Sequence, residues 1–324
     1  MELMQPEIIS IGEPLLEFSA STPGDLHQVE QFVVGWGGDS SNFAIAASRS
    51  GSKVGYITRL GQDEFGRSFL NLWTAEGIDT RFVEQDPDRF TGFYFISRKD
   101  QKHTFTYYRK ESAASRIRPE SLPFETIRNA RLVHVTGIAQ GISSSGARTI
   151  DAAIETAKAA GATVSYDPNL RLKLWSLEKA KATILPTIAR SDIVFPSFED
   201  AEALTGLTDE AQIARFFLDL GPRIVLLKLG SKGVLLATRE SKPTGAEIQL
   251  AHFKAHKVES LDFSGAGDTF AGAFAANYLT GASLEECTRY ANAAAALTTT
   301  GLGCVKPIPC RDAIEQLMRN QDGQ

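Results

Sequence analysis

The residues best suited to catalysis lie at positions 262–270, which read Asp-Phe-Ser-Gly-Ala-Gly-Asp-Thr-Phe. Gly265 and Gly267 allow the backbone to turn tightly and to expose its amides before a predicted helix rich in Ala, Gly and Phe. The amides of Gly265, Ala266 and Gly267, at the start of that helix, are typical of a site that binds a phosphoryl group in transfer. Asp268 could accept the proton of a substrate hydroxyl. The alternative is structural, with Asp268 as an N-cap and the glycines as a tight turn.

A second set of chemically informative residues is cationic. Arg109 ends a β-rich segment, and Arg171 lies shortly after the predicted strand 163–167. Ligands of parallel sheets bind beyond the carboxyl ends of the strands, so we expect both guanidinium groups in one crevice. Two arginines suit a carboxylate, because each offers a planar fork of donors. Other interpretations stay open: Arg109 could be a solvated charge, and Arg171 could pair with Asp167 or face a nucleotide phosphate.

Strands and helices in alternation must position these residues. Short apolar runs predict strands, and apolar residues at helical spacing predict helices. The predicted strands are 7–12, 54–58, 132–136, 163–167, 192–195 and 223–229, and the predicted helices are 145–160, 209–220, 268–279 and 283–299. This order indicates an α/β fold with a doubly wound, mainly parallel sheet that helices cover on both faces.

One region departs from that order. Three β-rich segments follow one another without an intervening helix, namely 81–84, 91–98 and 104–109. The last two are joined by a plausible hairpin connection at 99–103, and 16–34 could add strands. We expect a small antiparallel sheet that forms a lid beside the main sheet. The chain is interpreted as a single α/β domain over 1–320, with the lid formed from 14–36 and 81–111.

Composition limits the class of protein. The 324 residues are 43% hydrophobic and carry a formal net charge of −5. That balance argues against nucleic acid or a membrane surface as a partner, and no apolar run approaches a membrane span. Cys287, Cys304 and Cys310 show no pairing framework, which favours a reducing, cytoplasmic location.

The loop at 262–270 resembles the C-terminal signature of the ribokinase-like (pfkB-type) sugar kinases. Further segments resemble that family in the same order along the chain. They are Gly35-Trp-Gly37-Gly38-Asp39-Ser-Ser-Asn42, Gly61-Gln-Asp63-Glu-Phe-Gly66, Gly77-Ile-Asp79-Thr80, Lys228-Leu-Gly230-Ser-Lys-Gly233 and Tyr290-Ala-Asn292-Ala-Ala. The resemblance spans the whole chain and implies a ribokinase-like fold, a doubly wound α/β sheet with a β-lid.

The resemblance also implies an ATP-dependent kinase and assigns roles to residues. Asp268 would deprotonate the substrate hydroxyl, while the amides of Gly265, Ala266 and Gly267 neutralise charge on the phosphoryl group. The implied nucleotide-binding residues are Ser197, Lys228, Gly230, Ser231, Gly233, Gly265, Gly267 and Asn292. For Lys228 the alternative is a strand-end lysine that reaches solvent.

Mg²⁺ is expected to bridge the nucleotide phosphates. The family's Asn-x-x-Glu motif, which organises this metal through water, is matched here by Ser197 and Asp200, so Asp200 is the expected water-mediated metal residue. The alternative for this stretch is a helix cap with an acidic first turn. Phe263-Ser264 replaces the family's usual Thr-Thr or Asn-Thr pair, so a monovalent cation is left open without support.

The lid indicates which sugar is phosphorylated. Three segments resemble those of 2-keto-3-deoxygluconate kinases within the family: Tyr107-Tyr108-Arg109, Asp167-Pro-Asn169-Leu-Arg171 and Gly37-Gly38-Asp39. We therefore expect this sugar acid to be converted to its 6-phosphate, because a neutral sugar would leave two arginines uncompensated. The implied substrate-binding residues are Gly38, Asp39, Asn42, Tyr94, Tyr107, Tyr108, Arg109 and Arg171, with Glu17 as a further candidate.

Two other functions are compatible with the sequence. One is a fructokinase or another sugar kinase of the same fold. The other, of a different class, is a catalytically silent sugar-binding or regulatory relative, although the intact Asp268 argues against it. Free edges on the lid would be a liability, so we also expect a homodimer or larger homo-oligomer formed through the lid.

Overall fold

The computed structural model describes residues 5–99, 102–242 and 245–322. Its strands are β1 (Ile8–Ile11), β2 (Leu15–Ala20), β3 (Phe32–Gly37), β4 (Val54–Gly61), β5 (Val83–Asp86), β6 (Phe93–Lys99), β7 (Lys102–Tyr108), β8 (Leu132–Thr136), β9 (Thr163–Asp167), β10 (Ile193–Val194), β11 (Ile224–Lys228), β12 (Val234–Lys242) and β13 (Gly245–Phe253). Its helices are α1 (Asp39–Arg49), α2 (Glu64–Ala75), α3 (Phe124–Asn129), α4 (Gly137–Gly141), α5 (Ser144–Ala159), α6 (Leu177–Ala189), α7 (Phe198–Thr205), α8 (Glu210–Leu220), α9 (Ala266–Tyr278), α10 (Leu284–Thr298) and α11 (Arg311–Asp322).

The main sheet has nine strands in the order β13-β12-β11-β10-β9-β8-β1-β4-β5. All neighbours from β11 to β5 are parallel, as the sequence predicts. Successive strands move outward in opposite directions from the boundary between β1 and β8. Such a switch of direction leaves a crevice at the carboxyl ends of the strands, where ligands of α/β sheets bind. The doubly wound α/β fold predicted from the sequence is confirmed.

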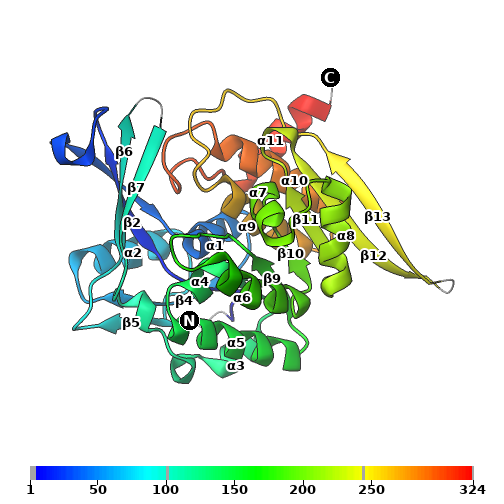
Figure 1. The fold of residues 1–324 in the computed structure, drawn as a ribbon, viewed down its shortest axis with the longest axis horizontal. Coiled ribbons are helices and arrows are strands. Elements are labelled where there is room, and N and C mark those ends of the chain that lie inside the picture. The colour runs from blue at the N-terminus through cyan, green and yellow to red at the C-terminus, as the bar shows by residue number, and fades with distance from the viewer. Residues whose placement is uncertain (1–4, 100–101, 243–244, 323–324) are drawn as a thin grey trace.

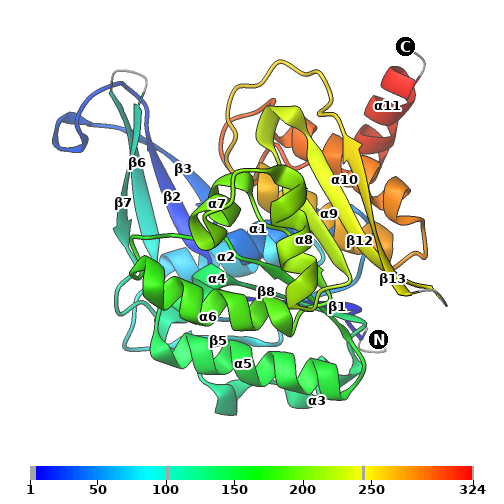
Figure 2. The same ribbon diagram turned by 45° about the vertical axis from the view of Figure 1, so that its right-hand side comes forward.

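Helices cover both faces of this sheet and enclose two hydrophobic cores (Figure 1; Figure 2). One core packs β-strand side chains such as Ile8 against α1, α2, α9, α10 and α11. The other packs the opposite-facing Ile9 and Ile11 against α3, α4, α5, α6, α7 and α8. Burial on both sides explains why these strands read as continuous apolar runs.

A second sheet of four strands, in the order β3-β2-β6-β7, stands beside the main body (Figure 2). It is the lid, and β2 pairs with β6 in parallel while the other neighbours are antiparallel. The prediction that 81–84 belongs to the lid is wrong: β5 pairs in parallel with β4 at the edge of the main sheet, where Val83 packs on the core. The predicted hairpin at 99–103 includes residues 100–101, which lie outside the described residues.

Alternation along the strands gives the lid two chemically different faces. One face carries Glu17, Tyr94 and Tyr107. The other is aromatic, with Phe93 stacked on Tyr108 at 5.0 Å between ring centres.

The sequence analysis did not predict helices α2, α3, α4, α6 and α11, and two further features also differ from it. The antiparallel hairpin β12–β13 extends the sheet beyond β11, and α9 begins at Ala266 rather than Asp268.

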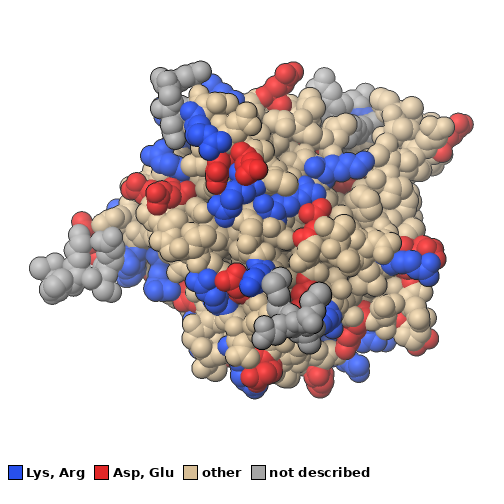
Figure 3. Space-filling model, turned by 180° about the vertical axis from the view of Figure 1, so that it is seen from behind, with Lys and Arg blue, Asp and Glu red and all other residues tan. Residues whose placement is uncertain are grey.

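Over the face seen in Figure 3, Lys and Arg side chains are interspersed with Asp and Glu. Among the described residues, none of the helices is both long and apolar enough to cross a membrane.

Candidate active site

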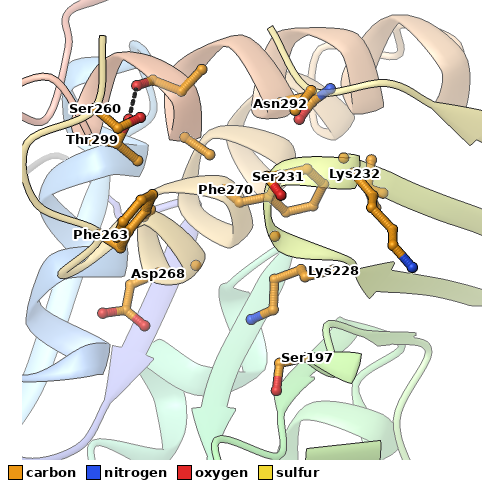
Figure 4. Close-up of a pocket in the computed structure, with 18 of the residues that line it drawn as sticks. Ser197, Lys228, Ser231, Lys232, Ser260, Phe263, Asp268, Phe270, Asn292 and Thr299 are labelled. Atoms are coloured by element: carbon orange, nitrogen blue, oxygen red, sulfur yellow. Dashed lines mark hydrogen bonds between the residues drawn. The ribbon is translucent and has the colours of Figure 1, made fainter. Parts of the chain in front are cut away.

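A groove of about 1250 Å³ opens at the carboxyl ends of the main-sheet strands. Twelve of the predicted catalytic, nucleotide, metal and substrate residues line it, and we call this the nucleotide side: Arg171, Ser197, Asp200, Lys228, Gly230, Ser231, Gly233, Gly265, Ala266, Gly267, Asp268 and Asn292. In Figure 4, Asp268 and Lys228 come from different elements and point into the space between them. Segments that are distant in the sequence thus meet in one cavity.

The glycine-rich loop adopts the geometry that its composition predicts. Gly265 is the N-cap of α9 and has a φ of 74°, in the left-handed region. A Cβ there would lie 3.0 Å from the carbonyl oxygen of Cys304, so a larger residue is disfavoured by the backbone conformation and would be tightly packed. The first-turn amides of a helix have no intrahelical partner and can bind an anion. The Ala266 amide already has a long contact, 3.4 Å, to the oxygen of Phe263.

Asp268 is the third residue of α9 and not its N-cap, so its carboxylate is turned to the site and not to the helix end. Its Oδ2 accepts a hydrogen bond of 2.8 Å from Asn42 Nδ2. Burial raises the pKa of Asp268 to about 7, and the neighbouring carboxylate of Asp39 adds to the rise, while Asn42 opposes it. A carboxylate with this pKa can accept a proton near neutral pH.

Lys228 is held inside the groove by a carboxylate that the sequence-based site did not include. Its Nζ lies 2.6 Å from Asp167 Oδ2, and the Lys228 side chain is 17% exposed. A Cβ on Gly267 would lie 3.2 Å from the same ammonium, so the charge stands beside the glycine-rich loop. The alternative of a lysine that reaches solvent is not supported. Asp167 pairs with Lys228, whereas Arg171 donates to the oxygen of Leu170 at 2.9 Å.

The helix-cap interpretation of Ser197 and Asp200 is confirmed, and the role of Asp200 at a metal stays a prediction. Ser197 caps α7 by accepting from the amide of Asp200 at 3.1 Å, and both residues line the groove. Asp200 Oδ2 also accepts from the amide of Leu170. Burial raises the pKa of Asp200, and the charge of Arg171 opposes that rise.

The far end of the nucleotide side is formed by backbone and small residues. Gly230 and Gly233 have φ values of 59° and 102° and bracket the turn after β11. A Cβ on Gly233 would lie 2.0 Å from the oxygen of Phe253. Asn292 Nδ2 donates to the oxygen of Lys254 at 2.7 Å, so its amide is fixed at the groove wall.

The other predicted substrate residues lie beside the groove and do not line it. We call the group of Gly38, Asp39, Asn42, Tyr94, Tyr107 and Arg109 the sugar side. Asp39 and Asn42 are buried in α1, and Asp39 Oδ2 accepts from Asn169 Nδ2 at 3.1 Å. Asn169 belongs to the Asp-Pro-Asn segment singled out in the sequence but was not among the predicted site residues; it follows β9 and has a φ of 35°.

Tyr94 connects the lid to the glycine-rich loop. Its hydroxyl donates to Glu17 Oε2 at 2.5 Å and lies 3.8 Å from Cys304 Sγ, and Cys304 borders Gly265. Burial raises the pKa of Tyr94 well above its usual range, so the phenol stays protonated and can donate.

Arg109 differs from its prediction, because its charge is already compensated. Its Nη2 forms an ion pair with the buried carboxylate of Glu13, a residue that follows β1 and was missed. Glu13 could have been recognised from the sequence, because it is an acidic residue shortly after the first strand of a parallel sheet. The argument that a neutral sugar leaves Arg109 unpaired is therefore corrected.

Tyr107 lies among cations. The guanidinium carbon of Arg109 is 5.5 Å and the Nζ of Lys173 is 5.6 Å from the centre of its ring. Lys173, also missed, donates to the oxygen of Phe105 in the lid at 3.1 Å. Burial raises the pKa of Tyr107, and the charges of Arg171 and Arg109 oppose the rise.

Tyr108 does not lie with the other predicted substrate-binding residues, so its prediction is corrected. It alternates with Tyr107 and lies on the opposite, aromatic face of the lid, 49% exposed and stacked on Phe93. Strand periodicity makes adjacent residues face opposite ways, so the pair Tyr107-Tyr108 cannot contact one ligand from one strand.

Comparison with known proteins agrees with this arrangement. The family model for the pfkB family carbohydrate kinases matches residues 5–311. The 2-dehydro-3-deoxygluconokinase of Thermoproteus tenax is 33% identical over 318 residues, which cover 96% of this chain and 94% of that protein. Probable fructokinase-4 of Arabidopsis thaliana is 32% identical over 325 residues, 96% of each chain.

Solved structures show the same similarity. A PfkB protein from Polaromonas sp. JS666 is 31% identical, with a TM-score of 0.85 over 96% of this chain and 99% of that one. A fructokinase from Vibrio cholerae O395, in a form with bound fructose, ADP and calcium ion, is 26% identical, with a TM-score of 0.83 over 97% and 99% of the two chains. With its ribokinase-like fold and this match along nearly its whole length, the chain belongs to the pfkB family of carbohydrate kinases.

Proposed function

We propose that this sugar kinase transfers the γ-phosphoryl group of ATP to the 6-hydroxyl of 2-keto-3-deoxygluconate. The observation that carries the choice of a sugar acid is the position of Arg109 and Lys173 against the ring of Tyr107, whose pKa the charge of Arg171 also lowers. Arg171 is exposed in the groove, so its charge is available to a carboxylate. A relative with the corresponding activity supports the same choice.

The nucleotide side fits ATP. Lys228 and the amides of Gly265 and Gly267 offer positive charge where phosphates would lie, and Asn292 borders the far end. Asp167 and Asp200 line the same groove, and one or two carboxylates with substrate phosphates are the usual environment of Mg²⁺. Bound Mg²⁺ would supply charge neutralisation on the phosphates, with Asp200 holding it through water.

Asp268 would act as general base. Its carboxylate accepts the proton of the attacking hydroxyl as the oxygen bonds to the γ-phosphorus and ADP leaves. Asn42 keeps the carboxylate in place through its 2.8 Å hydrogen bond, and Lys228 stands beside the loop that faces the developing charge.

Fructose is the second candidate substrate. The specific observation in its favour is the ion pair of Arg109 with Glu13, which leaves less uncompensated charge than two free arginines would. Fructokinases also stand among the relatives. Among the described residues, neither Arg171 nor Lys173 forms an ion pair of the kind that joins Arg109 to Glu13, although the charges of Arg171 and Asp200 interact, and this favours the sugar acid.

The test is ADP release from Mg-ATP with 2-keto-3-deoxygluconate, fructose, ribose or no sugar, with Asp268→Asn alongside. We expect turnover only with the sugar acid and none above background in the variant. Turnover with fructose instead would overturn the substrate and keep the kinase. Absence of turnover with every sugar would favour a silent sugar-binding relative.

We also propose that residues 1–320 work as one unit and that two copies associate through the lid. The strands β3 and β7 are edges of the lid sheet, and the aromatic face leaves Val34 and Tyr108 45% and 49% exposed. A lid from a second copy would cover both features. Sedimentation should give the mass of a dimer or larger assembly, and Tyr108→Arg should lower it to one chain. A wild-type mass of one chain at micromolar concentration would refute the proposal.

A cytoplasmic location is part of the proposal. The reaction consumes ATP, and Cys287 and Cys304 are buried, unpaired thiols of the kind that persist in a reducing compartment. Localisation of a tagged chain would test it.

A further inference from the structure

Glu13 is a buried carboxylate at the junction of the lid and the main sheet. It lies between β1 and the first lid strand β2, and 1% of the residue is exposed. Its backbone also borders the sugar side, since a Cβ on Gly38 would lie 2.4 Å from the Glu13 oxygen. A carboxylate this deep needs partners, because an unpaired buried charge is costly.

Those partners come from the segment that returns from the lid. Arg109 Nη2 pairs with Oε2 of Glu13, and Ser112 Oγ donates to Oε1 at 3.1 Å. Both residues follow β7, the last lid strand. The ion pair therefore joins two of the places where the chain passes between the main sheet and the lid, and both oxygens of Glu13 are used.

The guanidinium of Arg109 has donors left over. Its Nε is buried and has no hydrogen-bond partner among the described residues, and its side chain is 11% exposed. Arginine presents five donors in a rigid fork, so a bond that fixes one end of the fork also fixes the direction of the rest. A buried donor without a partner is stabilised when a ligand supplies an acceptor.

We propose that Glu13 is a positioning residue for specificity: it fixes Arg109 so that the remaining donors face the sugar side, and so sets the preference for a sugar acid over a neutral sugar. This inference rests on the proposed function. Glu13 also cancels the charge of Arg109, so Arg109 contributes directed hydrogen bonds and Arg171 contributes the net charge that a carboxylate meets.

A merely structural role gives different expectations. If the ion pair only braced the base of the lid, its loss would lower stability and would impair both kinds of sugar alike. The partly buried pair of Arg49 and Glu76, with side chains 18% and 16% exposed and outside the groove lining, provides the matched control.

The experiment measures KM and kcat for 2-keto-3-deoxygluconate and for fructose, together with the thermal midpoint. It uses wild type, Glu13→Gln, Glu13→Asp, Arg109→Met, the Glu13→Gln/Arg109→Met double variant and the control Glu76→Gln. Fructose is included even if it is a poor substrate, because the ratio of the two sugars is the quantity of interest.

We expect Glu13→Gln to raise the KM for the sugar acid roughly tenfold with kcat within about threefold, since an interaction that holds the ligand equally before and in the transition state changes KM. The fructose parameters should change less than about threefold. Glu13→Asp should recover part of the loss, because it keeps the charge. In the Arg109→Met background, Glu13→Gln should raise the KM for the sugar acid by less than a further factor of about two, because Glu13 acts through Arg109. Glu76→Gln should lower the thermal midpoint without a change in KM.

An unchanged sugar-acid KM in Glu13→Gln, an equal rise for both sugars, or a further tenfold rise in the Arg109→Met background would overturn the inference. If Glu13→Gln does not fold, Glu13→Asp in the two backgrounds decides the same question. A wild-type enzyme without sugar-acid turnover refutes the proposed function itself, which is distinct from an active enzyme indifferent to Glu13.

Discussion

On the nucleotide side the protein presents backbone amides, glycines and strand ends to an open groove, whereas on the sugar side it buries charged side chains against one another. Gly265, Gly230 and Gly233 shape the first region through positive φ values. The second depends on pairs such as Glu13 with Arg109, whose partners are 96 positions apart. The first region takes its backbone shape from local conformation, although its Lys228 is held by Asp167, 61 positions away, and the second depends mainly on contacts between distant segments.

This difference separates chemistry from specificity. A phosphoryl group can be bound by amides that any sequence supplies if glycines allow the turn, so the nucleotide side needs few particular side chains. A sugar is distinguished by directed donors and charges, which must be held by further residues. Asp268 lies where the two regions meet, through its hydrogen bond from Asn42.

The largest effect is expected at that meeting point. Asp268→Asn should lower kcat by about 10³–10⁴-fold and leave both KM values within a few-fold, because it removes the base and keeps the shape. ADP release under saturating substrates measures this, with the surface variant Asp219→Asn as control. A loss of less than tenfold would mean that positioning alone drives the reaction and that the residue shared by both regions is not the base.

Lys228→Met should impair the use of ATP much more than the use of the sugar, and should thereby distinguish the two regions. We expect kcat/KM for ATP to fall about 10²-fold, because the ammonium beside Gly267 is lost and the Asp167 carboxylate is left unpaired in the groove. KM for the sugar should change less than about threefold. Initial rates with each substrate varied in turn provide the measurement, and Lys158→Met on the surface of α5 is the control. A comparable effect on the KM for the sugar would show that the two regions do not act on separate substrates.

Arg171 lines the groove, and its charge also lowers the pKa of Tyr107 on the sugar side, so the substrate that it contacts tests where one region ends and the other begins. Arg171→Met should raise KM for the sugar acid about 30-fold and leave KM for ATP and for fructose within about threefold. Arg171→Lys should recover only part, because it lacks the planar fork. A rise in the KM for ATP instead would mean that Arg171 contacts the nucleotide and not the sugar.

The same difference explains what could be predicted from the sequence. The parallel strands β4, β8, β9 and β11 were predicted because burial on both faces leaves apolar runs in the sequence. The glycine-rich loop was predicted because its backbone geometry depends on the glycines within the loop itself. Edge elements were harder: β5 lies in the main sheet because of its pairing with β4, which no local pattern specifies.

The pairing of side chains could not be predicted from the sequence. The partners of Arg109, Asp268 and Lys228 are Glu13, Asn42 and Asp167, between 61 and 226 positions away. Composition shows that these charges exist but not which ones neutralise each other. The misplacement of Tyr108 was avoidable, since alternation along a strand already assigns it to the face opposite Tyr107.

The smallest effect concerns stability and pH at Asp268. Burial raises its pKa to about 7, whereas the unfolded chain has the ordinary value near 3.8. Between these values the native state holds a proton that the unfolded state releases, so the free energy of unfolding falls as pH rises from about 4 to 7. Asp268→Asn removes this proton binding and the charge that burial disfavours.

We therefore expect the variant and the wild type to be equally stable near pH 4, and the variant to be more stable by about 1–2 kcal/mol at pH 8, below the full linkage value because neighbouring carboxylates titrate with Asp268. Denaturation of the ligand-free proteins at several pH values measures the difference, and Asp219→Asn should track the wild type throughout. A variant less stable than wild type at pH 8 would show that the bond from Asn42 outweighs burial. A more stable variant would mean that the carboxylate joining the two regions is kept for catalysis at a cost to the fold.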